Sequence, residues 1–449
     1  MTSPGAVLSI ILITYLLIVL DLCIAYTGMP EIAADLGMGP VELSWVQNAY
    51  LLCFGGFLLL SARAGDLFWF KRTLLSGIFL FAVSSLVIGF AGSPVELIAA
   101  RAVQGVGASI IAPSVFFLIA VNFPEGEPRN KALAWYSMVA GVGSSLDMVL
   151  GGFFAGALSW RVGFLVNVPI GAALWLAGWI VLDNTRHGVG RLDVAGAIIS
   201  TVGMASFVWG IVRTADHGWS DPSALLALVV AVAMLSLFVR LQARTSDPLL
   251  PLDIFNSRVR VGAYLARMCF LGGAVGFFFF ETQFLQRVLG FSPVEADFCF
   301  LPMTVLTFAT AVFVPRLTLL FGNAMLLCLS MAANLFWLSL AGPDAVVWRD
   351  IALPMVLVGI GNGGGLGPLT VVGVAGVSGR NQGAASGAVN VAHQLGGSLD
   401  LSILVTIFAS EAGAPLWQQL SATIFATGIL LALGLIFAAV LILPAARRP

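Results

Sequence analysis

The chain has 449 residues, of which 59% are hydrophobic and only 10% are charged, and its formal net charge is −1. Soluble domains carry about 25% charged residues, whereas the mean hydropathy of this chain is +1.01. These values exclude an ordinary soluble domain and predict a protein that crosses a membrane many times. The small net charge gives no reason to expect nucleic acid or another strongly charged partner.

The residues needed for a metal or nucleotide site are scarce. The chain has five cysteines, which lie singly in apolar segments, and three histidines, His187, His217 and His393. Neither set has the spacing of metal ligands. The glycine-rich run at Gly361 lacks the lysine of a phosphate-binding loop. We therefore expect no metal, no cofactor, no enzymatic activity and no ATP-driven pump.

Membrane spans follow from apolar runs of about 20 residues. The chain contains fourteen, at about 6–28, 42–61, 74–92, 95–121, 132–157, 163–182, 194–213, 222–241, 260–281, 294–315, 322–342, 351–376, 383–409 and 418–443. With this division fifteen lysines and arginines fall in the loops and tail of one side and four on the other. Because cytoplasmic loops are enriched in positive charge, both termini are predicted to be cytoplasmic, in the inner (cell) membrane.

The chain contains an internal repeat. The sequence from Arg129-Asn130 to Asp147 resembles the sequence from Arg380-Asn381 to Asp400, at an offset of about 253–255 residues. A glycine-rich run ending in proline precedes each copy. The repeat predicts an all-α fold with a six-helix bundle at 1–183, two inserted helices at 184–245 and a second six-helix bundle at 246–449. Two such halves around a central cavity are a transporter architecture.

Charged residues inside the spans are the first candidates for function, because each is costly in hydrocarbon. Asp21 in the first span can hold a proton, or it can be a structural acid bonded to hydroxyls such as Tyr26. Arg101 in the fourth span must find an acceptor, and the amide of Gln104, one turn further on, can bridge to it. The alternative is an arginine that only ties two spans together.

The fifth and thirteenth spans carry a second set of candidates. Gly143, Asp147 and Gly151 are four residues apart and therefore share a helix face, where small residues allow close packing or gating. In the thirteenth span, Asn390, His393 and Asp400 share a face and are predicted, with Asp147, to line a substrate cavity. Structural hydrogen bonds are the alternative for each of these polar groups.

Several short motifs in order resemble the major facilitator superfamily, and within it the fourteen-span drug:proton antiporters. The resemblance rests on Leu20-Asp21 with Met29-Pro30, Ala62 to Arg72, Arg101-Ala-Val-Gln104-Gly105-Val-Gly107, Gly141 to Gly152, and Pro248-Leu-Leu-Pro251-Leu with Phe255. It implies that spans one and four are neighbours, which makes Asp21 one candidate acceptor for Arg101, and that Arg101 takes part in proton coupling. The charges of the loop with Asp66, Lys71 and Arg72 can lock a closed cytoplasmic gate; the alternative is ordinary positive-inside anchoring by Lys71 and Arg72.

The chain also departs from this family. Ala62, Trp69 and Phe70 replace residues that family members usually keep in the loop, and Asp147-Met148 stands where Gly-Pro is usual. Asp297 and Asp400 also occupy positions that relatives keep small. These acids either form an acidic cavity for a cation or for protons, or weaken helix packing.

The predicted function is secondary active transport, namely proton-coupled efflux of lipophilic or cationic drugs and toxic organic compounds by alternating access. The expected partners are a small-molecule substrate, protons and the lipid bilayer, and the protein is expected to be a monomer. The alternative is a facilitator or specific metabolite exporter on the same fold, without drug:proton antiport.

Overall fold

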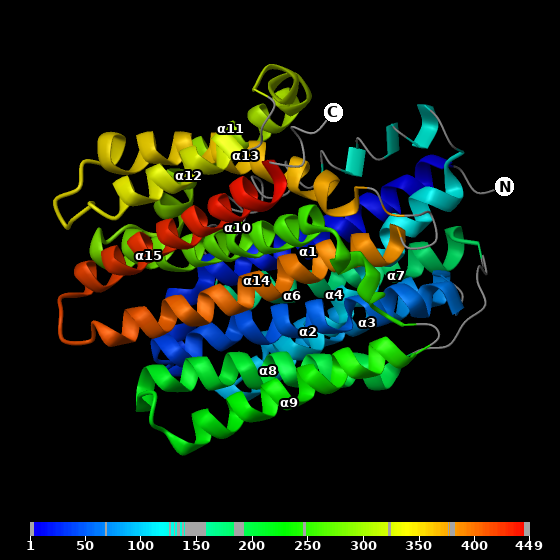
Figure 1. Cartoon of the computed structure of the whole chain (residues 1–449), viewed down its shortest axis with the longest axis horizontal. Helices are drawn as coiled ribbons and strands as arrows, with labels where there is room; N and C mark the ends of the chain where they lie inside the picture. The colour runs from blue at the N-terminus through cyan, green and yellow to red at the C-terminus, as the bar shows by residue number, and fades with distance from the viewer. Residues whose placement is uncertain are drawn as a thin grey trace.

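A computed structural model describes residues 4–67, 70–124, 127–129, 131, 132, 135, 136, 139, 159–183, 193–245, 248–321, 325–375, 377 and 382–443. Long helices run side by side along the long axis of the molecule (Figure 1). Their bounds are α1 Pro4–Leu36, α2 Pro40–Leu67, α3 Phe70–Gly89, α4 Pro94–Asn122, α6 Trp160–Leu165, α7 Asn167–Val181, α8 Val194–His217, α9 Pro222–Arg244, α10 Arg258–Gln283, α11 Pro293–Phe321, α12 Met325–Leu338, α13 Leu353–Val374, α14 Gln382–Ser410 and α15 Leu416–Phe437. A 3₁₀ turn, η2 (Leu252–Asn256), and three π-helical segments, η3 (Phe284–Val288), η4 (Val347–Ala352) and η6 (Ala438–Ile442), adjoin them.

Twelve helical segments in the described part of the chain are long and apolar enough to cross a membrane. Of the other two predicted spans, 132–157 falls almost entirely outside the described residues, and 322–342 corresponds to α12, a helix of 14 residues. A total of fourteen spans therefore stays a prediction. Helix α1 extends to Leu36, well beyond the predicted boundary at 28, because hydropathy marks the apolar part of a helix rather than its end.

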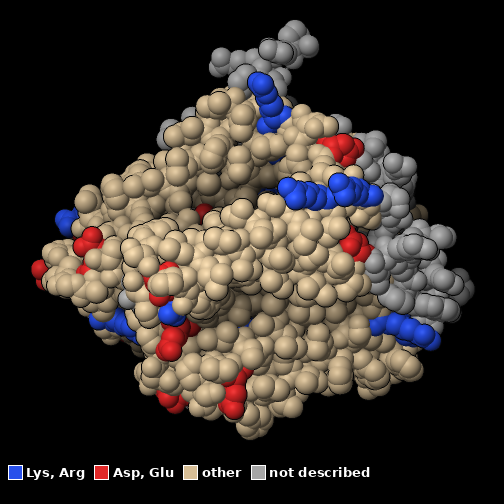
Figure 2. Space-filling view, turned by 60° about the horizontal axis from the view of Figure 1, so that its bottom comes forward, with Lys and Arg blue, Asp and Glu red and all other residues tan. Residues whose placement is uncertain are grey.

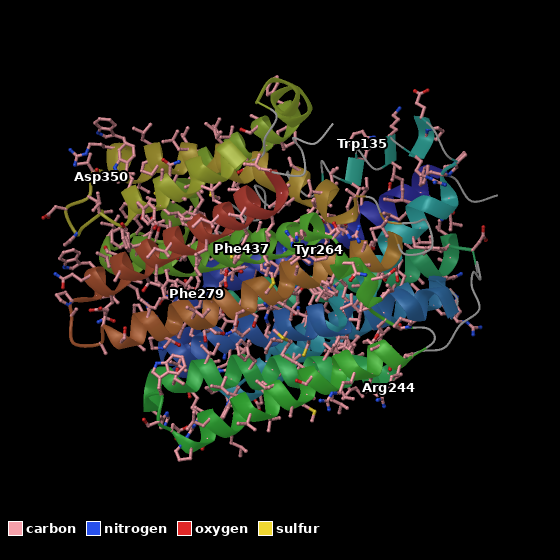
Figure 3. All side chains as sticks on the ribbon, viewed as in Figure 1. Trp135, Arg244, Tyr264, Phe279, Asp350 and Phe437 are labelled. Carbon is pink, nitrogen blue, oxygen red and sulfur yellow. The ribbon has the colours of Figure 1, made fainter. Side chains whose placement is uncertain are left out.

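The outer surface of the bundle is apolar, as a lipid-facing surface must be. On α9, Leu226, Val229 and Val232 are each 64–65% exposed. The face shown in Figure 2 is largely uncharged across its middle, with charged side chains gathered toward its two sides. Asp350 and Arg244 lie at opposite ends of the bundle, with Phe279 and Tyr264 between them (Figure 3).

Helix starts at the ends of the bundle have capping sequences. The Ser93 hydroxyl accepts a hydrogen bond from the Glu96 amide at 3.3 Å, and Pro94 begins α4. Asp221 caps α9 in the same way, accepting from the Ala224 amide at 2.9 Å and from Arg213 Nε at 2.7 Å. Both motifs satisfy amides that a helix leaves unpaired. The Ala224 amide and Arg213 also hold the pKa of Asp221 below its usual range.

The helices pack in two groups that meet along two lines. In the first group α4 packs against α2 and α3, and α3 packs against α7; in the second, α13 packs against α11 and α12, and α15 against α10 and α12. Helix α2 contacts α14 and α1 contacts α10 across the boundary between the groups. Helix α8 covers α2 and α14 from outside, and α9 packs on α8 (Figure 1).

Glycines allow equivalent backbone contacts in the two groups. A Cβ at Gly105 of α4 would overlap the Tyr50 carbonyl of α2, and a Cβ at Gly359 of α13 would overlap the Met303 carbonyl of α11. Gly359 follows Gly105 by 254 residues and Met303 follows Tyr50 by 253 residues. These separations match the offset of the repeat. Backbones that approach this closely leave no room for a side chain.

Gly105→Ala is therefore expected to destabilise the protein by about 1–3 kcal/mol, because the added methyl group forces α2 and α4 apart. The measurement is the melting temperature of the purified protein in detergent, followed by tryptophan fluorescence. Gly367→Ala on α13 is the matched control, since no heavy atom lies within 4 Å of the Cβ position there. Equal melting temperatures for the two variants would contradict this account of the packing.

Candidate functional site

A buried ion pair joins α1 to α4. Nη1 of Arg101 donates to Oδ2 of Asp21 at 2.6 Å, and neither side chain has any exposed surface. Sequence reasoning proposed Asp21 as one acceptor for Arg101, and the structure places the two in contact. Removing both charges from water is costly, so the pair depends on further hydrogen bonds for its stability.

Amide side chains complete the surroundings of the Asp21 carboxylate. Its Oδ1 accepts from Gln104 Nε2 at 2.6 Å and from Asn167 Nδ2 at 2.8 Å. Gln104 Nε2 also donates to the Ser85 hydroxyl at 2.9 Å. The carboxylate is therefore held by three donors from α4 and α7, with α3 supporting them. Tyr26, considered from sequence as an alternative partner of Asp21, accepts a hydrogen bond from Gln47 Nε2.

Arg101 has acceptors besides the carboxylate. Its Nε donates to the Val46 carbonyl at 3.0 Å, Nη1 to Gln104 Oε1 at 2.6 Å and Nη2 to Gln47 Oε1 at 3.2 Å. The guanidinium carbon also lies 4.4 Å from the centre of the Tyr50 ring, in a cation–π contact. These neutral partners come from α2 and α4, and they hold the guanidinium in place independently of Asp21.

The network continues to the second group of helices. Gln47 Nε2 donates to the Tyr26 hydroxyl at 3.0 Å. The Tyr26 ring stacks on Phe278 of α10 with centroids 5.8 Å apart. Gln47 thus bonds both Arg101 and Tyr26. The hydrogen bonds of Gln47 and the ring contact of Tyr26 with Phe278 therefore connect the ion pair to the second group of helices.

Other polar contacts cross the same boundary. Asn48 of α2 donates to Ser402 and accepts from Ser398, both on α14 and both at 3.1 Å. Thr27 of α1 donates to Asp297 of α11 at 3.5 Å, and its carbonyl accepts from Gln286 at 3.4 Å. Asp297 therefore lies at the boundary between the groups, beside the end of α1 that follows Tyr26.

A second buried arginine lies in α10. Arg267 Nη1 donates to Thr370 Oγ1 at 2.6 Å and to the Leu366 carbonyl at 3.4 Å, and its Nη2 lies 3.3 Å from His393 Nδ1. Asp400, also buried, packs its carboxylate against Gly272 of α10. The predicted substrate residues His393 and Asp400 are thus both at the packed surface between α10 and α14. Asn390, one turn before His393, is exposed.

Residues 11–399 match the family model described as Major Facilitator Superfamily. The chain belongs to the major facilitator superfamily. The match covers most of the chain, including the helices that hold Asp21, Arg101 and Arg267. The protein is therefore a multi-pass membrane transporter of this superfamily.

Curated relatives of this major facilitator protein align over nearly its whole length. The cephamycin export protein CmcT of Amycolatopsis lactamdurans is 35% identical over 410 residues, which are 89% of this chain and 84% of that protein. The puromycin resistance protein pur8 of Streptomyces alboniger is also 35% identical, over 91% of this chain and 82% of that protein.

Solved structures share the fold at low sequence identity. A bacterial homolog of the human lysosomal transporter Spinster, described as inward-facing and unoccupied, matches with a TM-score of 0.70 at 15% identity over 99% of this chain and 97% of its own. A peptide-bound POT family transporter matches with a TM-score of 0.72 at 13% identity over 99% of this chain and 96% of its own. At these identities the likeness shows the fold alone.

The predicted gating residues of this major facilitator protein are only partly described. Gly143, Asp147 and Gly151 lie outside the described residues, as does the side chain of Asp66. Lys71 donates to the Trp179 carbonyl at 2.6 Å and lies over the Trp179 ring, so it ties the start of α3 to α7. Arg72 is exposed. A gating role for these residues stays a prediction.

Sequence reasoning missed four residues that contribute directly to these networks. Gln47, Ser85 and Asn167 lie in apolar spans and bond the ion pair or its partners. Arg267 lies inside the predicted span 260–281, and no role is predicted for it from the sequence. Isolated amides and cations within apolar runs were the available signal, but only the fold shows which of them converge.

Arg101→Gln is expected to destabilise the protein by about 3–5 kcal/mol, because it leaves a buried carboxylate without its cation. The double variant Asp21→Asn with Arg101→Gln is expected to lose less than the sum of the two single variants, because the partners are coupled. Unfolding of the purified protein in detergent measures these losses. Arg349→Gln, which breaks an exposed pair with Asp350, is the control, and Arg101→Gln unfolding like this control would refute the assignment.

Proposed function

We propose that this protein is a proton-coupled exporter of small lipophilic organic compounds, drugs among them, that works by alternating access. It would then belong to the fourteen-span drug:proton antiporter branch. Support comes from relatives named for export or resistance, namely the cephamycin export protein and the puromycin resistance protein, each 35% identical to this chain. Transport rather than catalysis is the proposed activity, with no cofactor required.

The observation that carries the proposal is the fully buried Asp21–Arg101 pair. A buried carboxylate is the group in a membrane bundle that can take up and release a proton. When Asp21 is protonated it loses its charge, yet Arg101 keeps the Val46 carbonyl, the two glutamine oxygens and the Tyr50 ring. The pair can therefore open without leaving the guanidinium unsolvated.

Coupling requires that the protonation state of Asp21 change the relative free energies of two conformations. Gln47 supplies a physical route, because it bonds Arg101 through its oxygen and Tyr26 through its nitrogen. Tyr26 in turn stacks on Phe278 across the boundary between the helix groups. A shift of Arg101 on protonation of Asp21 would thus alter a contact that holds the two groups together.

The wider arrangement is part of the same proposal. Residues 1–183 and 246–449 would be the two moving halves, with 184–245 as inserted helices. The protein would lie in the inner (cell) membrane. The distribution of lysine and arginine would place both of its termini on the cytoplasmic side. The working unit would be a monomer, and the predicted acids Asp147, Asp297 and Asp400 remain candidates for a substrate or proton path.

Everted membrane vesicles test the proposed coupling. An imposed pH gradient, acidic inside, is expected to drive accumulation of Nile red, a neutral dye, or ethidium, a cation, because protons leaving the vesicle would be exchanged for dye. Nigericin, which collapses the pH gradient, should stop the accumulation. Dye movement that continues unchanged after nigericin would show a facilitator instead and would refute the antiport mechanism.

Asp21→Asn is expected to abolish accumulation driven by the pH gradient while the protein remains in the membrane at wild-type levels, because asparagine keeps the shape of the site but cannot carry the proton. Asp35→Asn on the same helix is the matched control, since Asp35 forms a partly exposed ion pair with Arg161 and such pairs contribute little. Full coupled transport by Asp21→Asn would remove Asp21 from the mechanism.

A further inference from the structure

Arg267 lies on the face of α10 that meets the first group of helices. Phe278, three turns further along the same face, stacks on Tyr26 of α1. Val275 packs against the hydrophobic core of the first group. The phenol of Tyr15, also on α1, lies within electrostatic reach of Arg267. The guanidinium is therefore at the boundary between the halves.

The depth of Arg267 separates it from the lipid headgroups. It is the tenth residue of the 26-residue helix α10, which places it about 13 Å from the start of the helix at 1.5 Å per residue. Its side chain is 5% exposed. An arginine at this depth is out of reach of a headgroup at the membrane surface, so a group that neutralises its charge has to lie within the helix bundle.

The contacts of Arg267 are all neutral. Thr370 Oγ1, the Leu366 carbonyl and His393 Nδ1 accept from its two terminal nitrogens, and Nε has no partner. Because a guanidinium can only donate, His393 accepts at Nδ1 and is the neutral ring with its proton on Nε2. Within the described residues no carboxylate forms an ion pair with Arg267.

Within the described residues, the acids of α10 and α14 do not compensate this charge. Glu281, the acid of α10, lies 14 residues and about 21 Å beyond Arg267 along the helix. Asp400 faces Gly272, five residues and about 7.5 Å further along α10, and its Oδ2 has no hydrogen-bond partner. Helices α13 and α15, which also pack on α10, contain no charged residue. Arg267 thus differs from Arg101, whose charge is balanced by Asp21.

We propose that the Arg267 guanidinium, held in place by His393 and Thr370, binds a carboxylate or similar anionic group of the transported molecule. This inference rests on the proposed export function and specifies its substrate class. An unpaired buried cation is stabilised by an anionic ligand. The edge of the guanidinium that carries Nε and Nη2 matches the two oxygens of a carboxylate. Among the lipophilic or cationic compounds predicted from sequence, the proposal favours lipophilic ones that are anionic or zwitterionic over cations.

A purely structural role for Arg267 makes a different prediction. If the side chain only ties α10 to α13 and α14, its loss would weaken every ligand equally. The neighbouring contact between the Tyr264 hydroxyl and the Gly373 carbonyl, at 3.0 Å, already joins α10 to α13. It remains when Arg267 is changed, so the packing of these helices does not depend on the guanidinium alone.

The test compares two probes of nearly equal size, dansyl-phenylalanine, which has a carboxylate, and its neutral methyl ester. Binding is measured by dansyl fluorescence to the full-length protein in nanodiscs of phosphatidylcholine, with empty nanodiscs as background. The wild type is expected to bind the acid about ten-fold more tightly than the ester, in line with a charge-assisted hydrogen bond. Equal affinity, or no binding of the acid, overturns the proposal.

Variants assign the preference to its residue. Arg267→Gln is expected to bring the ratio of acid to ester affinity to about one. Arg267→Lys is expected to keep part of the preference for the acid, because lysine has the positive charge but not the paired N–H donors of a guanidinium. Arg258→Gln, an exposed arginine on the same helix, should keep the wild-type ratio. An unchanged ratio in Arg267→Gln, or an equal loss for both probes, overturns the proposal. No gradient is present, so failure of proton coupling would not affect these results.

Discussion

The buried Asp21–Arg101 ion pair is the interaction on which the first half of this transporter depends. Five helices contribute to it, because α1 supplies the acid, α4 the arginine and Gln104, α2 Gln47, α3 Ser85 and α7 Asn167. Burial of a charge pair is rarely a net source of stability. The proposed role of Asp21, in which a proton binds and leaves, would account for the presence of this costly pair.

The two halves share their packing but differ in charge. Gly105 and Gly359 make equivalent backbone contacts in the two groups of helices. Arg101 is balanced by an acid, whereas Arg267 has no acid partner among the residues that the structure describes. Under the two proposals made above, the first half would carry the proton and the second would bind the transported molecule. Helix α1 joins them, because it holds Asp21 and also meets α10 through Tyr26 and Phe278.

The all-helical fold could be predicted from sequence, because apolar runs of about 20 residues are specific to membrane spans. The contact between Asp21 and Arg101 could be predicted as one possibility, because the family resemblance makes spans one and four neighbours and Arg101 needs an acceptor inside the membrane. The roles of Asn167 and Gln47 were not, because an amide in an apolar run has no preferred partner until helices are packed. The unbalanced charge of Arg267 likewise becomes visible only when its neighbours are known.

The most direct test of the central claim is a count of protons when substrate binds. Purified protein in weakly buffered detergent solution is mixed with whichever dye it transports, and a pH-sensitive dye such as pyranine reports proton release. The account predicts that the wild type releases protons on binding and that Asp21→Asn, at equal dye occupancy, releases none. Proton release of the same size by both proteins would contradict the assignment of Asp21 as the coupling group.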